Sequence, residues 1–168
     1  MILVGLGANL PDLEGRGANE TLSSALQALR GSPDLQFLAA SRMWESAPVP
    51  VSDQPWYVNA VAAFESALAP REVLALLHRV EADFGRRRTV RNAARVLDLD
   101  LLAVDDLVTG CDQMAELVLP HPRMAERAFV LLPLRDIVPG WRHPATGETI
   151  DGLIAALDPT QVCRPLAA

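Results

Sequence analysis

Arg95-Val-Leu-Asp-Leu-Asp-Leu-Leu-Ala-Val104 predicts one buried β-strand, because branched apolar residues dominate the segment and its length suits a strand. Side chains alternate between the two faces of a strand, so Asp98 and Asp100 share one face and the neighbouring leucines share the other. Two carboxylates this close repel each other, and neither is cheaply buried without a partner. Magnesium accepts carboxylate oxygens together with phosphate oxygens. The segment therefore predicts a divalent-metal site on a central strand.

An arginine-rich segment, Gly85 to Arg95, lies directly upstream, with arginines at positions 86, 87, 88, 91 and 95. Taken alone, such a run is typical of a solvated surface. Guanidinium groups, however, bind phosphate oxygens in pairs, and a metal held by carboxylates neutralises the same phosphates. Beside the two aspartates, the arginines favour nucleotide-dependent phosphoryl transfer.

Length and composition indicate one folded domain over residues 1–168, with 50% of the residues hydrophobic and 21% charged. The formal net charge of −6 gives no reason to expect a nucleic-acid partner. All 15 basic residues are arginine, which excludes a catalytic lysine and a Walker-type phosphate loop. The two cysteines match no metal-ligand spacing, and no apolar run reaches the length of a membrane span. We expect a cytoplasmic monomer that binds small molecules.

Periodicity and turn residues predict strands at 2–6, 35–44, 57–65, 95–104 and 117–119, and helices at 20–30, 70–84, after 121 and at 149–157. Gly5-Leu-Gly7 is interpreted as a tight turn after the first strand. The order strand–helix–strand–strand–helix–strand is that of the split βαβ, ferredoxin-like arrangement. We therefore expect an α+β fold with a mostly antiparallel sheet and helices on one face. The other face is expected to carry the active-site loops, 7–18, 46–56, 85–95 and 120–128.

Four motifs stand in order along the chain: Gly7-Ala-Asn9-Leu, Asp53-Gln-Pro-Trp-Tyr-Val-Asn59, Arg95-Val-Leu-Asp-Leu-Asp100 and His121-Pro-Arg-Met-Ala-Glu-Arg127-Ala-Phe129. Any one of them arises by chance, but four in this order and spacing are specific. Together they resemble the 6-hydroxymethyl-7,8-dihydropterin pyrophosphokinases of folate biosynthesis. The resemblance covers most of the chain from its first residue to the predicted last helix.

This resemblance implies a transfer of diphosphate from ATP to the pterin alcohol, with the hydroxyl attacking the β-phosphorus in line and AMP leaving. It implies that Asp98 and Asp100 hold two magnesium ions and that the catalytic set also includes Arg86 and Arg95. The implied ATP contacts are Arg88, Arg91, His121 and Arg127. The implied pterin contacts are the stacking rings of Tyr57 and Phe129, the amide of Asn59, and a pocket edge formed by Ser46, Ala47 and Val49.

Two other functions stay open beside this one. A magnesium-dependent nucleotidyltransferase also uses paired aspartates and arginines, but it releases pyrophosphate instead of AMP. A non-catalytic ferredoxin-like ligand-binding module needs neither the acidic pair nor the arginines, and magnesium should leave its ligand affinity unchanged.

Overall fold

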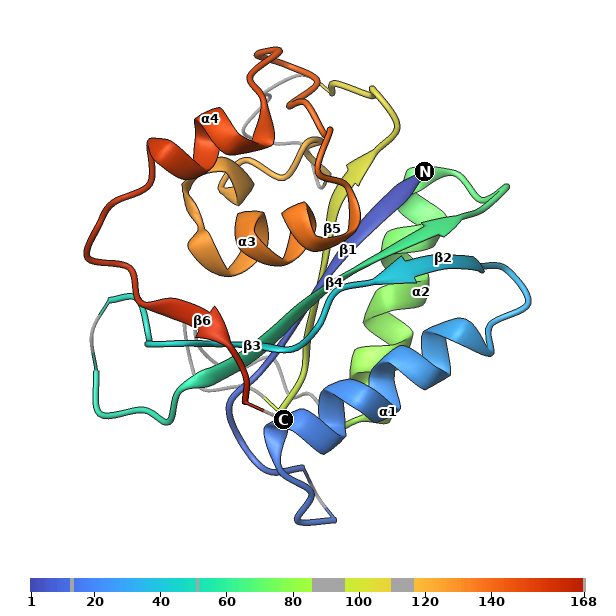
Figure 1. The fold of residues 1–168 in the computed structure, drawn as a ribbon. Coiled ribbons are helices and arrows are strands. Elements are labelled where there is room, and N and C mark those ends of the chain that lie inside the picture. The colour runs from blue at the N-terminus through green and yellow to red at the C-terminus, as the bar shows by residue number, and fades with distance from the viewer. Residues whose placement is uncertain (13, 51, 86–95, 110–116, 168) are drawn as a thin grey trace.

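The computed structural model describes residues 1–12, 14–50, 52–85, 96–109 and 117–167. Over these residues the order of the elements, shown in Figure 1, is β1 (Ile2–Ala8), α1 (Ala18–Arg30), β2 (Gln36–Ala40), β3 (Trp44–Ser46), β4 (Tyr57–Glu65), α2 (Pro70–Asp83), β5 (Asp98–Val104), η1 (Met124–Glu126), α3 (Ala128–Ile137), α4 (Ile150–Ala155) and β6 (Cys163–Pro165). The strands form one sheet in the order β5-β1-β4-β3-β6, with β2 also beside β4. All of the strand pairs in the described sheet are antiparallel. The mixed α/β fold and antiparallel sheet expected from the sequence are confirmed, and the ferredoxin-like detail stays a prediction.

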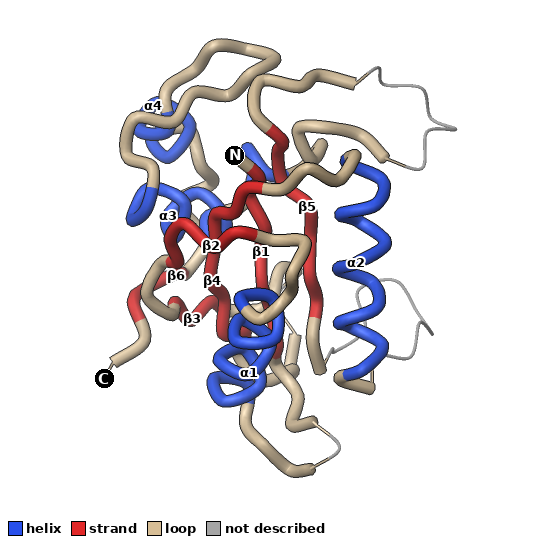
Figure 2. The backbone as a smooth tube through the Cα atoms, turned by 90° about the vertical axis from the view of Figure 1, so that its right-hand side faces the viewer, coloured by secondary structure: helices blue, strands red, loops and turns tan. Residues whose placement is uncertain are grey.

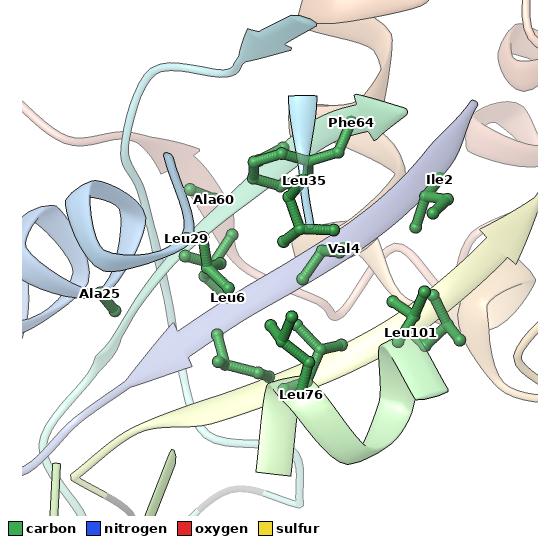
Figure 3. Packing of buried hydrophobic residues seen from close by; sticks show 14 of the residues in the cluster. Ile2, Val4, Leu6, Ala25, Leu29, Leu35, Ala60, Phe64, Leu76 and Leu101 are labelled. Atoms are coloured by element: carbon green, nitrogen blue, oxygen red, sulfur yellow. The ribbon is translucent and has the colours of Figure 1, made fainter. Parts of the chain in front are cut away.

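One face of the sheet packs against α1 and α2, as the apolar periodicity of both helices predicts. Figure 3 shows this core, in which Val4 and Leu6 of β1 meet Leu29 of α1 and Leu76 of α2. Phe64 of β4 is fully buried in the same cluster. Burial of these side chains supplies the hydrophobic free energy that holds the two helices to the sheet.

The opposite face carries helices as well as loops, which corrects the expectation of helices on one face only. Figure 2 shows the strands between α2 on one side and α3 and α4 on the other. Leu3, Val61 and Leu102 form a second buried cluster on this face with α3 and α4, which contribute Leu131 and Leu153 among others. The physical reason is that the central strands carry apolar side chains on both faces of the sheet, so both faces must be covered. The loops and the C-terminal helices therefore share this face.

Three local predictions were wrong. Gly5 and Gly7 are paired strand residues within β1, so they form no turn. The predicted strand 35–44 is divided into β2 and β3, because the Ser41 hydroxyl accepts the Val61 N–H at 3.0 Å in place of a ladder hydrogen bond. Residues 117–119 are not a strand, and β6 was not expected.

The strand with the two aspartates, β5, lies at the end of the strand order and not at its centre. An edge strand leaves backbone groups without a ladder partner. Here the Glu81 carboxylate of α2 accepts the Leu99 N–H at 2.7 Å. Because Glu81 is only 1% exposed, the Leu99 N–H has its hydrogen-bond acceptor in a buried setting.

Replacing Glu81 with leucine is expected to lower the free energy of unfolding by about 2 kcal/mol, because the buried Leu99 N–H loses its acceptor. Glu81→Gln keeps an acceptor oxygen and should lose clearly less. Urea denaturation of the two variants and the unmodified protein measures the difference. Equal losses in both variants would contradict the role given to this hydrogen bond.

Candidate active site

A cavity of about 460 Å³ opens on the sheet face opposite α1 and α2. This volume lies in the range of about 300–1,000 Å³ that is typical of small-molecule sites. Its floor is formed by β1, β4 and β5, and its walls by the segments that follow β3 and precede α3. The predicted site residues that line it are Ser46, Ala47, Val49, Tyr57, Asn59, Asp98, Asp100, Arg127 and Phe129.

The two aspartates stand opposite the two glycines of β1, since Asp98 pairs with Gly7 and Asp100 pairs with Gly5. A Cβ on Gly5 would lie 3.4 Å from the Leu102 side chain, and a Cβ on Gly7 would lie 3.5 Å from the Asn59 Oδ1 atom. Because neither residue has a Cβ, these two positions of β1 add no side-chain atoms to the cavity beside the two carboxylates. Sequence reasoning missed these two residues, although their spacing of two within an apolar strand was a usable signal.

Arg127 lies between the acidic pair and an aromatic ring. Its Nη1 atom is 3.5 Å from the Asp100 Oδ2 atom, and its guanidinium carbon is 5.5 Å from the centre of the Phe129 ring. Arg127 is the residue directly before α3, and Phe129 belongs to the first turn of that helix. One short segment therefore supplies a cation and an apolar ring to the same cavity.

Asp98 and Asp100 form a donor set that suits magnesium in combination with a phosphorylated ligand. Among the residues that the structure describes, no group of three or more His, Cys, Asp or Glu side chains could hold a metal ion. Magnesium commonly takes one or two carboxylates and completes its shell with water and substrate phosphates. Two hard oxygen ligands on one strand face therefore fit this ion without a third protein ligand.

His121 lies near this pair but does not line the cavity. Burial lowers the pKa of its imidazole below the usual range, while the charge of Asp100 acts to raise it and those of Arg127 and Arg123 act to lower it. The ring is therefore neutral at pH 7. Its Nδ1 atom accepts the Arg123 N–H at 3.2 Å, which assigns the proton to Nε2. Neutral His121 can thus donate one hydrogen bond from Nε2.

The cavity is also lined by amide and aromatic groups. The Asn59 Nδ2 group donates to the Ser46 Oγ atom at 2.9 Å, and Asn59 is 4% exposed. The Tyr57 hydroxyl donates to the Gln54 Oε1 atom at 3.3 Å, and Asn9 Nδ2 donates to the same oxygen at 3.3 Å. Gln54 also lines the cavity and was not singled out from the sequence. These contacts fix the orientation of polar groups that line the cavity.

The predicted phosphate contacts Arg86, Arg88, Arg91 and Arg95 lie outside the described residues. Their roles stay predictions. Further lining residues to which the sequence assigned no role include Arg123 and Glu126, which lie within the fourth motif, and Asp158 and Gln161, which lie outside all four. No helix in the described parts of the chain is long and apolar enough to cross a membrane.

The family model of 7,8-dihydro-6-hydroxymethylpterin-pyrophosphokinase matches residues 3–139. The chain belongs to this pyrophosphokinase family. It is 37% identical over 155 residues to a 2-amino-4-hydroxy-6-hydroxymethyldihydropteridine pyrophosphokinase from Pseudomonas aeruginosa, covering 92% of this chain and 90% of that protein. It is 35% identical over 161 residues to the protein of the same name from Methylorubrum extorquens, covering 96% of each. Membership makes the chain an ATP-dependent transferase of folate synthesis.

A solved structure supports the fold of this pyrophosphokinase. The crystal structure of a triple mutant of HPPK-DHPS from Plasmodium falciparum superposes with a TM-score of 0.68 at 14% sequence identity. The match covers 92% of this chain but 43% of the Plasmodium chain, so the likeness concerns one part of that larger protein. At this identity it bears on the fold alone.

Proposed function

We propose that the chain transfers diphosphate from ATP to 6-hydroxymethyl-7,8-dihydropterin in the cavity beneath Phe129, giving AMP and the pterin diphosphate. The observation that carries the proposal is that one cavity is lined by two kinds of side chain, aromatic and amide groups on the one hand and carboxylates on the other. Tyr57, Asn59 and Phe129 line it together with Asp98 and Asp100. A ligand with a flat heterocycle at one end and a site of phosphoryl transfer at the other suits this arrangement.

The pterin is proposed to lie between the rings of Tyr57 and Phe129, with Asn59 as its in-plane partner. Stacking and in-plane hydrogen bonds are the expected recognition of a flat amide-bearing bicycle. The low exposure of Asn59 and its contact with Ser46 support a fixed amide orientation. Ala47 and Val49 are proposed to form the edge of this pocket.

Two magnesium ions are proposed to bind Asp98 and Asp100, where they would neutralise the triphosphate during the transfer. Arg127 and the neutral His121 are proposed to bind phosphate oxygens, the first as a fixed cation and the second as a donor from Nε2. Arg86, Arg88, Arg91 and Arg95 remain the further proposed phosphate contacts. Positioning and charge neutralisation carry such a reaction, because the protein performs little covalent chemistry in phosphoryl transfer.

Product analysis tests the function. With ATP, magnesium and the pterin, chromatography should show AMP and pterin diphosphate in equal amounts. Pyrophosphate release would instead indicate the nucleotidyltransferase alternative. The absence of turnover, together with a ligand affinity that magnesium does not change, would indicate a binding module.

Removal of divalent metal by EDTA is expected to lower turnover by at least about 100-fold, since the triphosphate then lacks its main counter-charge. Addition of excess magnesium should restore the rate, and the restoration is the control for irreversible damage. Turnover that persists in EDTA-treated, metal-free buffer would contradict the magnesium proposal.

We also propose that the protein acts as a monomer in the cytoplasm and that residues 1–168 form one domain. The single sheet, which joins strands from β1 to β6, supports one domain. Light scattering of the purified protein, with a mass of 18.2 kDa expected for the monomer, tests the oligomeric state.

A further inference from the structure

The C-terminal segment 158–165 pairs with β3 and also contacts the backbone on either side of Arg127. Figure 1 shows β6, in red, running beside β3 after the chain leaves α4. In the register of this pair, Cys163 is opposite Ser46, and the Ala47 N–H donates to the Val162 carbonyl oxygen at 3.1 Å. The C-terminal segment is therefore anchored to the edge that is proposed to hold the pterin.

The same segment reaches the residues around Arg127 through one side chain. The Gln161 Nε2 group donates to the Glu126 carbonyl oxygen at 2.8 Å, and its Oε1 atom accepts the Ala128 N–H at 3.0 Å. These two peptide groups stand on either side of Arg127. A side-chain amide is needed here, because one partner is an acceptor and the other is a donor.

The backbone around Gln161 is itself held in place. The Asp158 Oδ1 atom accepts from the Thr160 N–H at 2.8 Å and from the Thr160 hydroxyl at 2.7 Å. The Gln161 N–H donates to the Asp158 carbonyl oxygen at 3.1 Å. The backbone of Gln161 is therefore held on one side by this turn and on the other by the pairing of β6 with β3.

We infer that Gln161 is a positioning residue for Arg127, acting through the two peptide groups that flank it. Holding those groups sets the direction in which the guanidinium leaves the chain, 3.5 Å from Asp100 and over the Phe129 ring. The inference rests on the proposed function, in which Arg127 binds ATP phosphates. Gln161 lies beyond residues 3–139, which the family model matches, so the motifs of the family do not indicate it.

The consequence is a selective effect on nucleotide binding. When both hydrogen bonds are lost, the Arg127 side chain can adopt other directions. Ordering it on nucleotide binding then costs free energy, which weakens the affinity for the nucleotide. Loss of the two hydrogen bonds in Gln161→Leu should weaken the binding of a non-hydrolysable ATP analogue with magnesium roughly tenfold. The affinity for the pterin alone should change less than about twofold, because the β6–β3 pairing does not depend on this side chain.

A double-mutant cycle separates positioning from a general structural role. Calorimetry would measure the analogue affinity of the unmodified protein, Gln161→Leu, Arg127→Ala and the double variant. If Gln161 acts through Arg127, its replacement has less than about a twofold effect once Arg127 is alanine. Val162→Ala is the matched control, since that neighbouring side chain is exposed and the change leaves both amide hydrogen bonds in place.

An unchanged analogue affinity in Gln161→Leu, or an equal loss with and without Arg127, would overturn the inference. If Gln161→Leu does not fold, Gln161→Ala is carried through the same cycle and judged by the same two results. The readout requires no turnover. If Gln161 and Arg127 are coupled in analogue binding but the protein releases no AMP, the proposed function is refuted and the positioning role stands. If the protein releases AMP but the two residues are not coupled, only the positioning role is refuted.

Discussion

Asp100→Ala is expected to lower kcat by about three orders of magnitude with saturating ATP, magnesium and pterin. Loss of one carboxylate removes a proposed ligand of the ions that neutralise the triphosphate, and such ions supply several kcal/mol of transition-state stabilisation. Asp98→Ala should act in the same direction. Release of AMP measured by chromatography gives the rate directly.

Two controls show whether the loss of activity comes from the loss of any nearby carboxylate or from unfolding of the variant. Asp106→Ala removes an exposed carboxylate from the turn after β5 and should leave kcat unchanged. Asp100→Ala relieves repulsion from Asp98 but also removes the ion pair with Arg127, so the two effects oppose each other and the unfolding temperature should change by only a few degrees. Normal turnover by a folded Asp100→Ala protein would remove the basis of the proposed mechanism.

Phe129→Ala is expected to raise the Kd for the pterin roughly 50-fold, because stacking of a flat heterocycle on an aromatic ring contributes about 1–3 kcal/mol. Phe129 lines the cavity at the first turn of α3. Pterin fluorescence, titrated in the presence of the ATP analogue and magnesium, measures the affinity.

Trp56→Ala is the matched control for an aromatic ring. Trp56 is 41% exposed, does not line the cavity, and its ring lies under the Arg164 guanidinium at 5.1 Å. Its replacement should change the pterin affinity less than about twofold. Similar losses in both variants, or none in Phe129→Ala, would contradict stacking on Phe129.

The local features of the site could be predicted from the sequence, because they depend on strand alternation. In β5 the period of two places Asp98 and Asp100 on one face and buries Leu99 on the other. The boundaries of β4 and the start of α2 at Pro70 followed from composition and from a proline at the first helical position. These signals act within a few residues of each other.

Features that depend on distant partners could not be predicted in this way. Within the described residues β5 pairs with β1, which is remote in sequence, and Glu81 of α2 accepts the Leu99 N–H. Glycine is a local turn signal, so the sequence predicts a turn at Gly5, whereas in the structure Gly5 pairs with residues of β4 and β5 that are remote in sequence. Gln161 has no local signal, since its partners are the peptide groups beside Arg127, more than 30 residues away.

The binding of metal by Asp98 and Asp100 against the triphosphate is tested most directly by anomalous diffraction. Crystals would be grown with manganese, as a scattering substitute for magnesium, and a non-hydrolysable ATP analogue. We expect anomalous peaks in direct contact with carboxylate oxygens of both aspartates and with phosphate oxygens of the analogue. A bound nucleotide whose metal ions lie elsewhere, with both carboxylates turned away from them, would contradict it.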